Sequence, residues 1–219
     1  MKNYIAGKEW KQEKYNHILD VSFRMFAEKG IEQVSMTELA QASGVGRMTL
    51  FRYFPSKTDL VIAVSIWKWS AFIEWHNSLL SAEELDKLTG AEYLKFYLDS
   101  FLDLYRNHKD ILRFNYNFNS FLSHQDETDK QKQPFQNMVD TLAEQFHILY
   151  ERGRLDCTLN TAVTEQTMFS SIFHIMLAAV TRYAIGLAIV NESEPESELV
   201  MLSDLILARM TCQNQEQYA

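Results

Sequence analysis

The side chains between Val34 and Lys57 have the types and the spacing needed to hold a polyanion. Arg47, Thr49 and Arg52 fall on one short predicted helix, where each can donate hydrogen bonds to a base edge or a phosphate oxygen. Lys57 follows just past a proline. A short capped helix, a glycine turn and a second short helix with such side chains are typical of a helix-turn-helix DNA reader.

The first of these two helices is marked at both ends. Ser35 and Glu38 have the spacing of a capping box, in which each side chain satisfies a free backbone N–H near the helix start. Gly44 can adopt the positive φ that ends a helix. Gly46 is a tolerable N-cap for the second helix, although a serine would be stronger.

Residues Ile18 to Leu60, about a fifth of the chain, resemble the tetracycline-repressor-like (TetR) family of transcriptional regulators. The glycine, apolar and aromatic positions of ILDVSFRMFAEKGIEQVSMTELAQASGVGRMTLFRYFPSKTDL fall in one register. The resemblance implies a dimeric, all-helical protein with an N-terminal DNA-binding domain and a C-terminal effector-binding domain. The family usually has serine or threonine at Gly46 and tyrosine at Phe51. Phe51 cannot donate a hydroxyl to a phosphate, so one common backbone contact is expected to be missing.

We expect the DNA contacts to come from the first helix, the turn and the outer side of the second helix, whose Leu50, Phe51 and Phe54 should face inward. The predicted DNA-binding residues are Ser35, Thr37, Gly46, Arg47, Met48, Thr49, Arg52, Tyr53 and Lys57. Lys57 stands in the first turn of the next predicted helix, where a cation opposes the helix dipole. A phosphate docked at that helix start would explain the placement, and the resemblance assigns the same role. The alternatives are a buried helix-turn-helix without DNA and, for Lys57, an ordinary surface lysine.

The charge distribution supports DNA binding better than the total charge does. The whole chain has a formal net charge of −8, which alone argues against a nucleic-acid binder. Residues 1–57 carry nine Lys and Arg against six Asp and Glu, a net of +3, so the remainder carries −11. A basic end on an acidic body would orient the molecule toward DNA.

The composition favours an all-α protein of one or two domains. Hydrophobic residues make up 47% of the 219 residues, and Gly90, Gly153 and Gly186 are the only glycines after Gly46. We expect a helix-turn-helix domain at 1–56 and a helical effector-binding and dimerisation domain at 57–219. The polar N-terminus and the absence of a long apolar run predict a cytoplasmic protein without a membrane segment.

Helices are predicted at about 9–29, 57–80, 90–107, 110–123, 134–152, 161–190 and 195–212, with a loop at 123–133. The helix that begins at Lys57 carries apolar stripes on two faces, which indicates a connector buried between neighbours. Nucleophile elbows, phosphate loops and zinc-ligand spacings are absent, so we predict neither enzymatic activity nor a cofactor or metal site.

Aromatic and amide side chains in the second domain are candidates for an effector pocket. The predicted ligand-binding residues are Trp67, Trp75, Tyr97, Phe101, Tyr105, Asn115, Phe118 and Asn119. Buried amides need hydrogen-bond partners, which a ligand could supply. An apolar or aromatic effector that is neutral or cationic fits this set. The alternative is that the aromatic stripe is simply core and the asparagines face water.

The last two predicted helices are long and apolar, which suits an isologous four-helix interface between two copies of the chain, where the resemblance also places it. The predicted interface residues are Met168, Ile172, Ile175, Ala179, Leu202 and Ile206. The alternative is that both helices are interior helices of a monomer.

The sequence therefore predicts a ligand-responsive transcriptional regulator, a repressor in the simplest form, that binds a palindromic double-stranded operator as a homodimer and is released by a small effector. One alternative is an activator or co-regulator on the same scaffold without a small ligand. A second is a helical enzyme or adaptor whose DNA-binding motif is vestigial.

Overall fold

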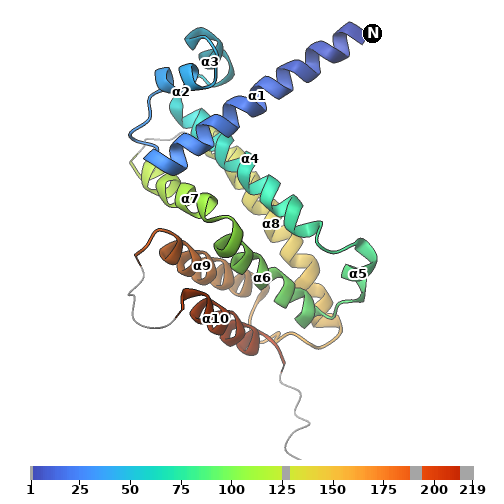
Figure 1. Ribbon diagram of the computed structural model, residues 1–219. Helices are drawn as coiled ribbons and strands as arrows, with labels where there is room; N and C mark the ends of the chain where they lie inside the picture. Colours follow the sequence, from blue (N-terminus) through green and yellow to red (C-terminus); the bar gives the residue numbers. More distant parts are fainter. Residues whose placement is uncertain (1, 125–128, 188–193, 213–219) are drawn as a thin grey trace, which may run out of the picture. The chain divides into compact units, whose positions relative to one another are not determined.

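The computed structural model describes residues 2–124, 129–187 and 194–212, with the backbone alone for 2–10 and 129–132. Every element in these ranges is an α-helix, and the β pairing described there is a single bridge between Leu159 and Thr211 (Figure 1). The helices are α1 (Lys2–Lys29), α2 (Met36–Ala42), α3 (Arg47–Tyr53), α4 (Lys57–Asn77), α5 (Ala82–Lys87), α6 (Gly90–Asn107), α7 (Lys109–Leu122), α8 (Asp129–Leu155), α9 (Glu165–Ala184) and α10 (Pro195–Met210). The predicted all-α fold is confirmed.

Several predicted elements differ from the observed ones, and α1 begins at Lys2 rather than at about residue 9. The segment predicted as a loop at 123–133 is helical from Asp129, and its residues 125–128 lie outside the described ranges. Lysine and glutamine at 130–133 are good helix formers, so a missing apolar period there did not mean a missing helix. Helix α9 ends at Ala184 rather than 190, shortly before Gly186 at φ +76°. The short helix α5 was not predicted, although Ser81 and Glu84 form a capping box.

The chain divides into two compact units, each built from two stretches of sequence. Unit 1 comprises residues 1–72 and 113–138, and unit 2 comprises residues 73–112 and 139–219. Helices α4, α7 and α8 each contribute residues to both units. The domain boundary expected at 56/57 therefore falls inside unit 1.

The core of unit 1 forms around the inner stripe of α1. Ile18, Leu19, Phe23 and Phe26 are at most 1% exposed, as their helical spacing predicts. Helix α7 supplies Phe114, whose ring centroid lies 5.5 Å from that of Phe23. Helix α2 packs against both α1 and α3, so this core holds the helix-turn-helix in place.

The core of unit 2 is made by α6, α9 and α10, which pack against one another, with α9 and α10 side by side (Figure 1). The first turn of α6 meets the end of α8 at a very close approach. A Cβ atom built on Gly90 would lie 2.0 Å from the Cα of Gly153, so this contact has no room for a side chain. The Gly90 N–H donates to Asp156 Oδ2 at 2.7 Å, and the Ala91 N–H donates to Thr158 Oγ1 at 2.9 Å.

Candidate nucleic-acid interface

Helix α2 is fixed at its start by the predicted capping box. Ser35 is extended at φ −88° and ψ 156°, and its Oγ accepts the Glu38 N–H at 3.2 Å. The Glu38 carboxylate in turn accepts the Ser35 N–H at 2.8 Å and its hydroxyl at 2.7 Å. These hydrogen bonds to the ionised carboxylate lower the pKa of Glu38 below its ordinary value. The capping box is confirmed.

The turn between α2 and α3 depends on a glycine. Gly44 has φ +62°, a conformation that other residues rarely adopt. Its N–H donates to Gln41 O at 3.1 Å, and the Val45 N–H donates to Ala40 O at 2.9 Å. Gly46 then starts α3 from extended backbone without a side-chain cap, as its residue type predicts.

Helix α3 presents one buried residue inward and a row of polar and flexible side chains outward. Leu50 is fully buried, whereas Arg47, Met48 and Arg52 are exposed, with Met48 at 84%. The Arg47 guanidinium lies 5.5 Å from the centroid of the Phe51 ring on its own helix. The outer side of α3 thus carries two cations and an apolar thioether, which suit base edges and phosphates.

The end of α3 is held by an aromatic cluster that the sequence did not indicate. The Tyr15 ring of α1 stacks on Phe54 at 5.2 Å and meets Tyr53 edge-on at 5.9 Å. Tyr53 is consequently half-buried rather than fully outside, and Phe51 is also half-buried. Tyr15 lies one turn before Leu19 on the inner stripe of α1, a spacing that could have placed it at this contact.

Lys57 begins α4 beside a second capping pair. Ser56 Oγ accepts the Asp59 N–H at 3.1 Å, and Asp59 Oδ2 accepts the Ser56 N–H at 3.0 Å. The Lys57 ammonium donates to Glu32 O at 3.3 Å and lies 5.7 Å from the Phe121 ring centroid. Partial burial lowers the pKa of Lys57. The ammonium has two further N–H donors with which to meet a phosphate at this helix start.

All nine predicted DNA-binding residues lie in unit 1. Ser35, Thr37, Gly46, Arg47, Met48 and Arg52 are exposed, while Thr49, Tyr53 and Lys57 are half-buried. They come from α2, the turn, α3 and the first residue of α4, within one short stretch of chain. The structure therefore presents most of this set on the surface.

Comparison with known proteins identifies this part of the chain. The sequence profile of the bacterial regulatory proteins of the tetR family matches residues 18–64. Residues 18–64 therefore match the TetR family of regulators. The HTH-type transcriptional regulator AcrR of Shigella flexneri is 42% identical over 53 residues, which are 24% of this chain and 25% of AcrR. The chain spans between about a quarter and about a half of the length of the curated relatives that it matches.

The fold beyond residues 18–64 is also shared with solved structures. A transcriptional regulator from Saccharomonospora viridis in complex with choline aligns with a TM-score of 0.72 at 14% identity, over 92% of this chain and 100% of that one. The regulator FadR from Bacillus subtilis in complex with stearoyl-CoA aligns with a TM-score of 0.69 at 17% identity, over 89% and 98%. At these identities the likeness shows the fold alone.

The predicted ligand-binding residues divide between the two units. Trp67, Asn115, Phe118 and Asn119 belong to unit 1, and Trp75, Tyr97, Phe101 and Tyr105 belong to unit 2. Phe118 is buried between Phe114 and Phe135, at 6.0 and 5.2 Å, and Asn119 is exposed. Neither unit by itself brings all eight residues together.

The unit 2 members of that set are mostly packed against other rings. Tyr97 lies 5.6 Å from Phe101 and 5.4 Å from Phe146, and Phe101 lies 6.3 Å from Phe173. Burial raises the pKa of Tyr97. Tyr105 meets Tyr183 edge-on at 6.3 Å, whereas Trp75 is exposed. The rings of Tyr97 and Phe101 therefore contribute to the core of unit 2, and that of Trp75 does not.

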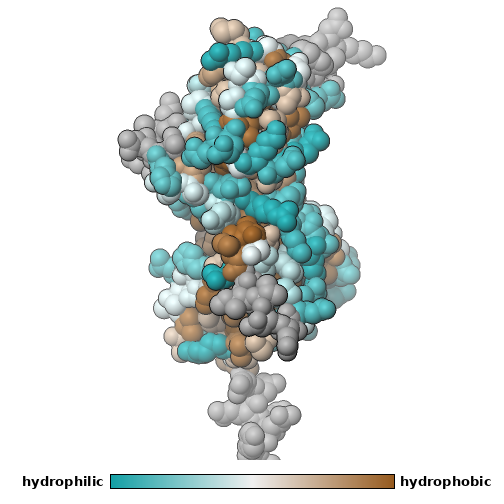
Figure 2. Space-filling view, turned by 60° about the vertical axis from the view of Figure 1, so that its left-hand side comes forward, coloured by the Kyte–Doolittle hydropathy of each residue, from teal (hydrophilic) through white to brown (hydrophobic). Residues whose placement is uncertain are grey.

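The predicted interface residues also differ in exposure. Met168, Ile172 and Ile206 are buried inside their own chain, at 0%, 0% and 7%, because they face the other helices of unit 2. Ala179 and Leu202 are half-buried, and Ile175 is 45% exposed. The exposed apolar side chains of α9 and α10 include Met201 and Leu205, at 58% and 60%, which the prediction did not contain. On the face drawn in Figure 2, hydrophobic patches interrupt a largely hydrophilic surface.

None of the helices in the described ranges is both long and apolar enough to cross a membrane. In the same ranges, His, Cys, Asp and Glu form no group of three that could hold a metal ion.

Proposed function

We propose that the protein is a ligand-responsive transcriptional regulator, a repressor in its simplest form, which binds a palindromic operator as a homodimer. The observation that carries this proposal is the outer side of α3. Arg47, Met48 and Arg52 project from a helix whose Leu50 is anchored in the core, next to a turn that Gly44 makes possible. Such a helix fits the major groove with its first residues at the base edges.

The homodimer rests on the exposed apolar side chains of α9 and α10. Ile175, Met201 and Leu205 each leave about half or more of the side chain exposed. Outward apolar residues on two adjacent helices favour burial against a second copy of the same surface. Two reading heads related by a two-fold axis would recognise an inverted repeat, with half-sites about one helical turn apart or a multiple of it.

The small-molecule effector is supported by the relatives and by the connecting helices. Solved structures with this fold hold stearoyl-CoA in one case and choline in another. Helices α4, α7 and α8 contribute residues to both units, so a ligand that moves them could alter DNA affinity. By linkage, an effector that releases DNA must bind the DNA-free form more tightly.

Selection from a random pool of duplex DNA tests the proposal directly. We expect an inverted repeat to be enriched, and the affinity for it to fall as salt rises because phosphate contacts release counterions. A shuffled duplex of the same length and composition serves as the control. Equal affinity for both duplexes, or no binding to either at low salt, would contradict the proposal.

A further inference from the structure

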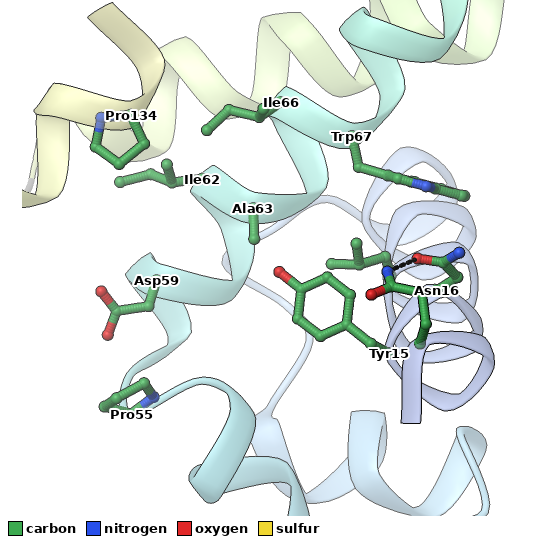
Figure 3. A pocket seen from close by; sticks show the side chains of 11 residues that line it. Tyr15, Asn16, Pro55, Asp59, Ile62, Ala63, Ile66, Trp67 and Pro134 are labelled. Carbon is green, nitrogen blue, oxygen red and sulfur yellow. Dashed lines mark hydrogen bonds between the residues drawn. The ribbon is translucent and has the colours of Figure 1, made fainter. Parts of the chain in front are cut away.

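A groove lies between α1 and α4 within unit 1, with a volume of about 700 Å³ (Figure 3). Its lining residues are Gln12, Tyr15, Asn16 and Leu19 on α1; Asp59, Ile62, Ala63, Ile66 and Trp67 on α4; and Pro55 and Pro134. This volume is within the range of small-molecule pockets. Of the predicted ligand-binding residues, only Trp67 lines it.

The groove exists because a small residue stands among large ones. The lining residues of α4 recur at three- and four-residue intervals, so they form one face of the helix. Ala63 lies in the middle of this face, with Tyr15 and Trp67 on one side and Ile62 on the other (Figure 3). The hollow therefore has an apolar floor and aromatic walls.

Among the side chains that the structure describes, the polar groups of the groove are few and do not include a basic one. Asp59 is the one charged residue among those that line it. Gln12 Nε2 donates to Asn16 Oδ1 at 3.0 Å, and the Tyr15 hydroxyl points toward Ala63 (Figure 3). Such a lining can bind hydrogen-bond donors and a cationic group of a ligand, and it disfavours the binding of an anionic ligand.

The two ends of the groove differ in charge. Asp59 and Trp67 are eight residues apart on α4, which corresponds to about 12 Å. Lys68 does not line the groove, but its ammonium lies next to the Trp67 end, 4.9 Å from the Trp67 ring centroid and 4.1 Å from that of Phe23. A cationic head group would consequently be placed at the Asp59 end, and an aromatic body near Trp67.

We propose that the groove between α1 and α4 is a second small-molecule site, which takes a molecule with a flat apolar body and a single amine head group. The site lies wholly within unit 1, which carries the helix-turn-helix, and shares only Trp67 with the residues predicted for the effector pocket. An effect of the bound molecule on DNA affinity rests on the proposed function, whereas binding of the molecule to the groove does not.

The site is connected to the recognition helix through Tyr15. This side chain lines the groove and also stacks on Phe54 and meets Tyr53 at the end of α3. Pro55, which lies between α3 and α4, and Asp59, in the first turn of α4, line the same groove. A bound molecule therefore touches residues that set the orientation of α3. By linkage, the factor by which the molecule changes the affinity for the operator equals the factor by which the operator changes the affinity for the molecule.

Three matched probes test the ligand class on the DNA-free full-length protein. These are 1-naphthylmethylamine, 1-naphthalenemethanol and 1-naphthaleneacetate, titrated by calorimetry. We expect the amine to bind with a dissociation constant on the order of 1 mM or tighter, given its dozen heavy atoms. The acetate should bind about tenfold more weakly, because Asp59 attracts one and repels the other. Binding of the acetate as tight as the amine, or no binding of the amine, overturns the proposal.

Filling the groove tests the location. Ala63→Phe should weaken the amine at least about tenfold, because the new ring occupies the hollow. Ala71→Phe is the control, since Ala71 is exposed on the same helix and does not line the groove. Unchanged amine binding by a folded Ala63→Phe protein overturns the location.

Because Ala63→Phe could fail to fold, the location is also tested by NMR on the protein without that substitution. The indole N–H resonance of Trp67, assigned with Trp67→Phe, should shift on addition of the amine while that of Trp75 stays in place. Shifts at Trp75 alone would overturn the location.

The charge at Asp59 is tested by Asp59→Asn, which keeps an acceptor for the Ser56 N–H. Glu84→Gln is the control, because it neutralises the carboxylate of another capping box, on α5. We expect Asp59→Asn to reduce the preference for the amine over the alcohol to about twofold or less, and Glu84→Gln to leave it unchanged. An unchanged preference in Asp59→Asn contradicts the assigned orientation.

The groove site and the proposed function are tested by separate experiments. Calorimetry on the DNA-free protein tests amine binding, and duplex selection without the amine tests DNA binding. DNA binding without amine binding removes only the groove site, and amine binding without DNA binding removes only the proposed regulator. If both hold, the amine should change operator affinity, and Ala63→Phe should abolish that change.

Discussion

Aromatic side chains are used differently in the two units. In unit 2, the rings of Tyr97, Phe101, Phe146 and Phe173 contact one another in a chain and fill the space between helices. In unit 1, part of the aromatic set packs in the same way around Phe114, but Tyr15 and Trp67 flank an open groove. A high density of aromatic residues therefore does not identify a pocket, because the size of the residue between them decides whether space remains.

The units also differ in what they leave at the surface. Unit 1 exposes polar and cationic side chains on α3, which suit a polyanion. Unit 2 exposes apolar side chains on α9 and α10. One unit is consequently suited to DNA and the other to a second copy of the chain, as the proposed function requires.

The largest expected effect is on stability, and it compares a ring packed in the core, Phe101, with a ring that lines the groove, Trp67. Phe101→Ala should lower the free energy of unfolding by about 3–5 kcal/mol, because the side chain is 4% exposed and its removal leaves a cavity. Trp67→Ala should cost less, about 1–2 kcal/mol, since this ring is half-buried beside open space. Urea unfolding measures both, and equal costs would show that Trp67 is part of the core.

Two isoleucines of α9, the exposed Ile175 and the buried Ile172, allow the effect of a substitution on dimerisation to be distinguished from its effect on folding. Ile175→Glu should yield a folded monomer and weaken operator binding about 100-fold, because the two reading heads are no longer linked. Ile172→Glu should unfold the protein, since Ile172 is fully buried. Gln166→Glu, exposed on the same helix, is the control for added charge. Sedimentation and circular dichroism read the two effects, and a dimeric Ile175→Glu protein would exclude this face as the interface.

Two basic residues of unit 1 should affect DNA binding in different ways. Arg47→Ala should cost about 1–3 kcal/mol on the selected operator and relax the preference at one base pair. Lys57→Ala should weaken all duplexes alike and lower the salt slope by about one. Fluorescence anisotropy at several salt concentrations measures both. If the two variants lose affinity in the same pattern, the assigned roles are wrong.

Capping boxes in the two units should differ in importance. Ser35→Ala should lower the free energy of unfolding by about 1 kcal/mol, because α2 carries the buried Leu39 and packs on α1 and α3. Ser81→Ala removes the same kind of cap from α5, which has no buried residue, and should cost only a few tenths of a kcal/mol. Thermal unfolding without DNA compares the pair, and a costlier Ser81→Ala would contradict this ranking.

The smallest expected effect is a pH dependence in unit 2. His76 is buried, its Nε2 lies 3.2 Å from Phe96 O, and burial lowers its pKa despite Asp103 at 3.6 Å. The unfolded chain therefore takes up a proton more readily than the folded one below about pH 6.5. Stability contributed by neutral His76 is present above that pH and declines as the pH falls, by no more than about 1.4 kcal/mol per pH unit.

Urea unfolding between pH 7.5 and 5.5 measures this slope. His76→Gln should reduce it, while His174→Gln, at an exposed position of α9, should not. His147 acts in the opposite direction, because its hydrogen bond to Glu165 raises its pKa. A slope unchanged in His76→Gln would assign the dependence to other groups.

Local features were predictable from the sequence, and features that depend on neighbours were not. The Ser35 capping box, the positive φ of Gly44 and the inward Leu50 each depend on residues within one or two turns. The inner stripe of α1 was predictable for the same reason. The same reasoning could have found α5 from Ser81 and Glu84.

Pocket and interface residues depend on which helices become neighbours. Ile172 and Ile175 are equally apolar in the sequence, and only the positions of α6 and α10 decide that the first is buried and the second exposed. The groove at Ala63 was not predictable either, because an alanine carries no sign of the space around it. Lys57 was correctly placed at a helix start, but its contact with the Glu32 carbonyl joins residues 25 positions apart.

The facing glycines of unit 2 restrict how this chain can vary. A Cβ on Gly90 would meet the backbone of Gly153, and one on Gly153 would lie 2.2 Å from Leu159 Cγ. A substitution at Gly90 cannot be relieved by a change of side chain at Gly153, since the nearest obstacles are main-chain atoms, whereas one at Gly153 meets the side chain of Leu159. A lineage that keeps this helix spacing is therefore held to glycine at position 90, while position 153 can change only together with Leu159.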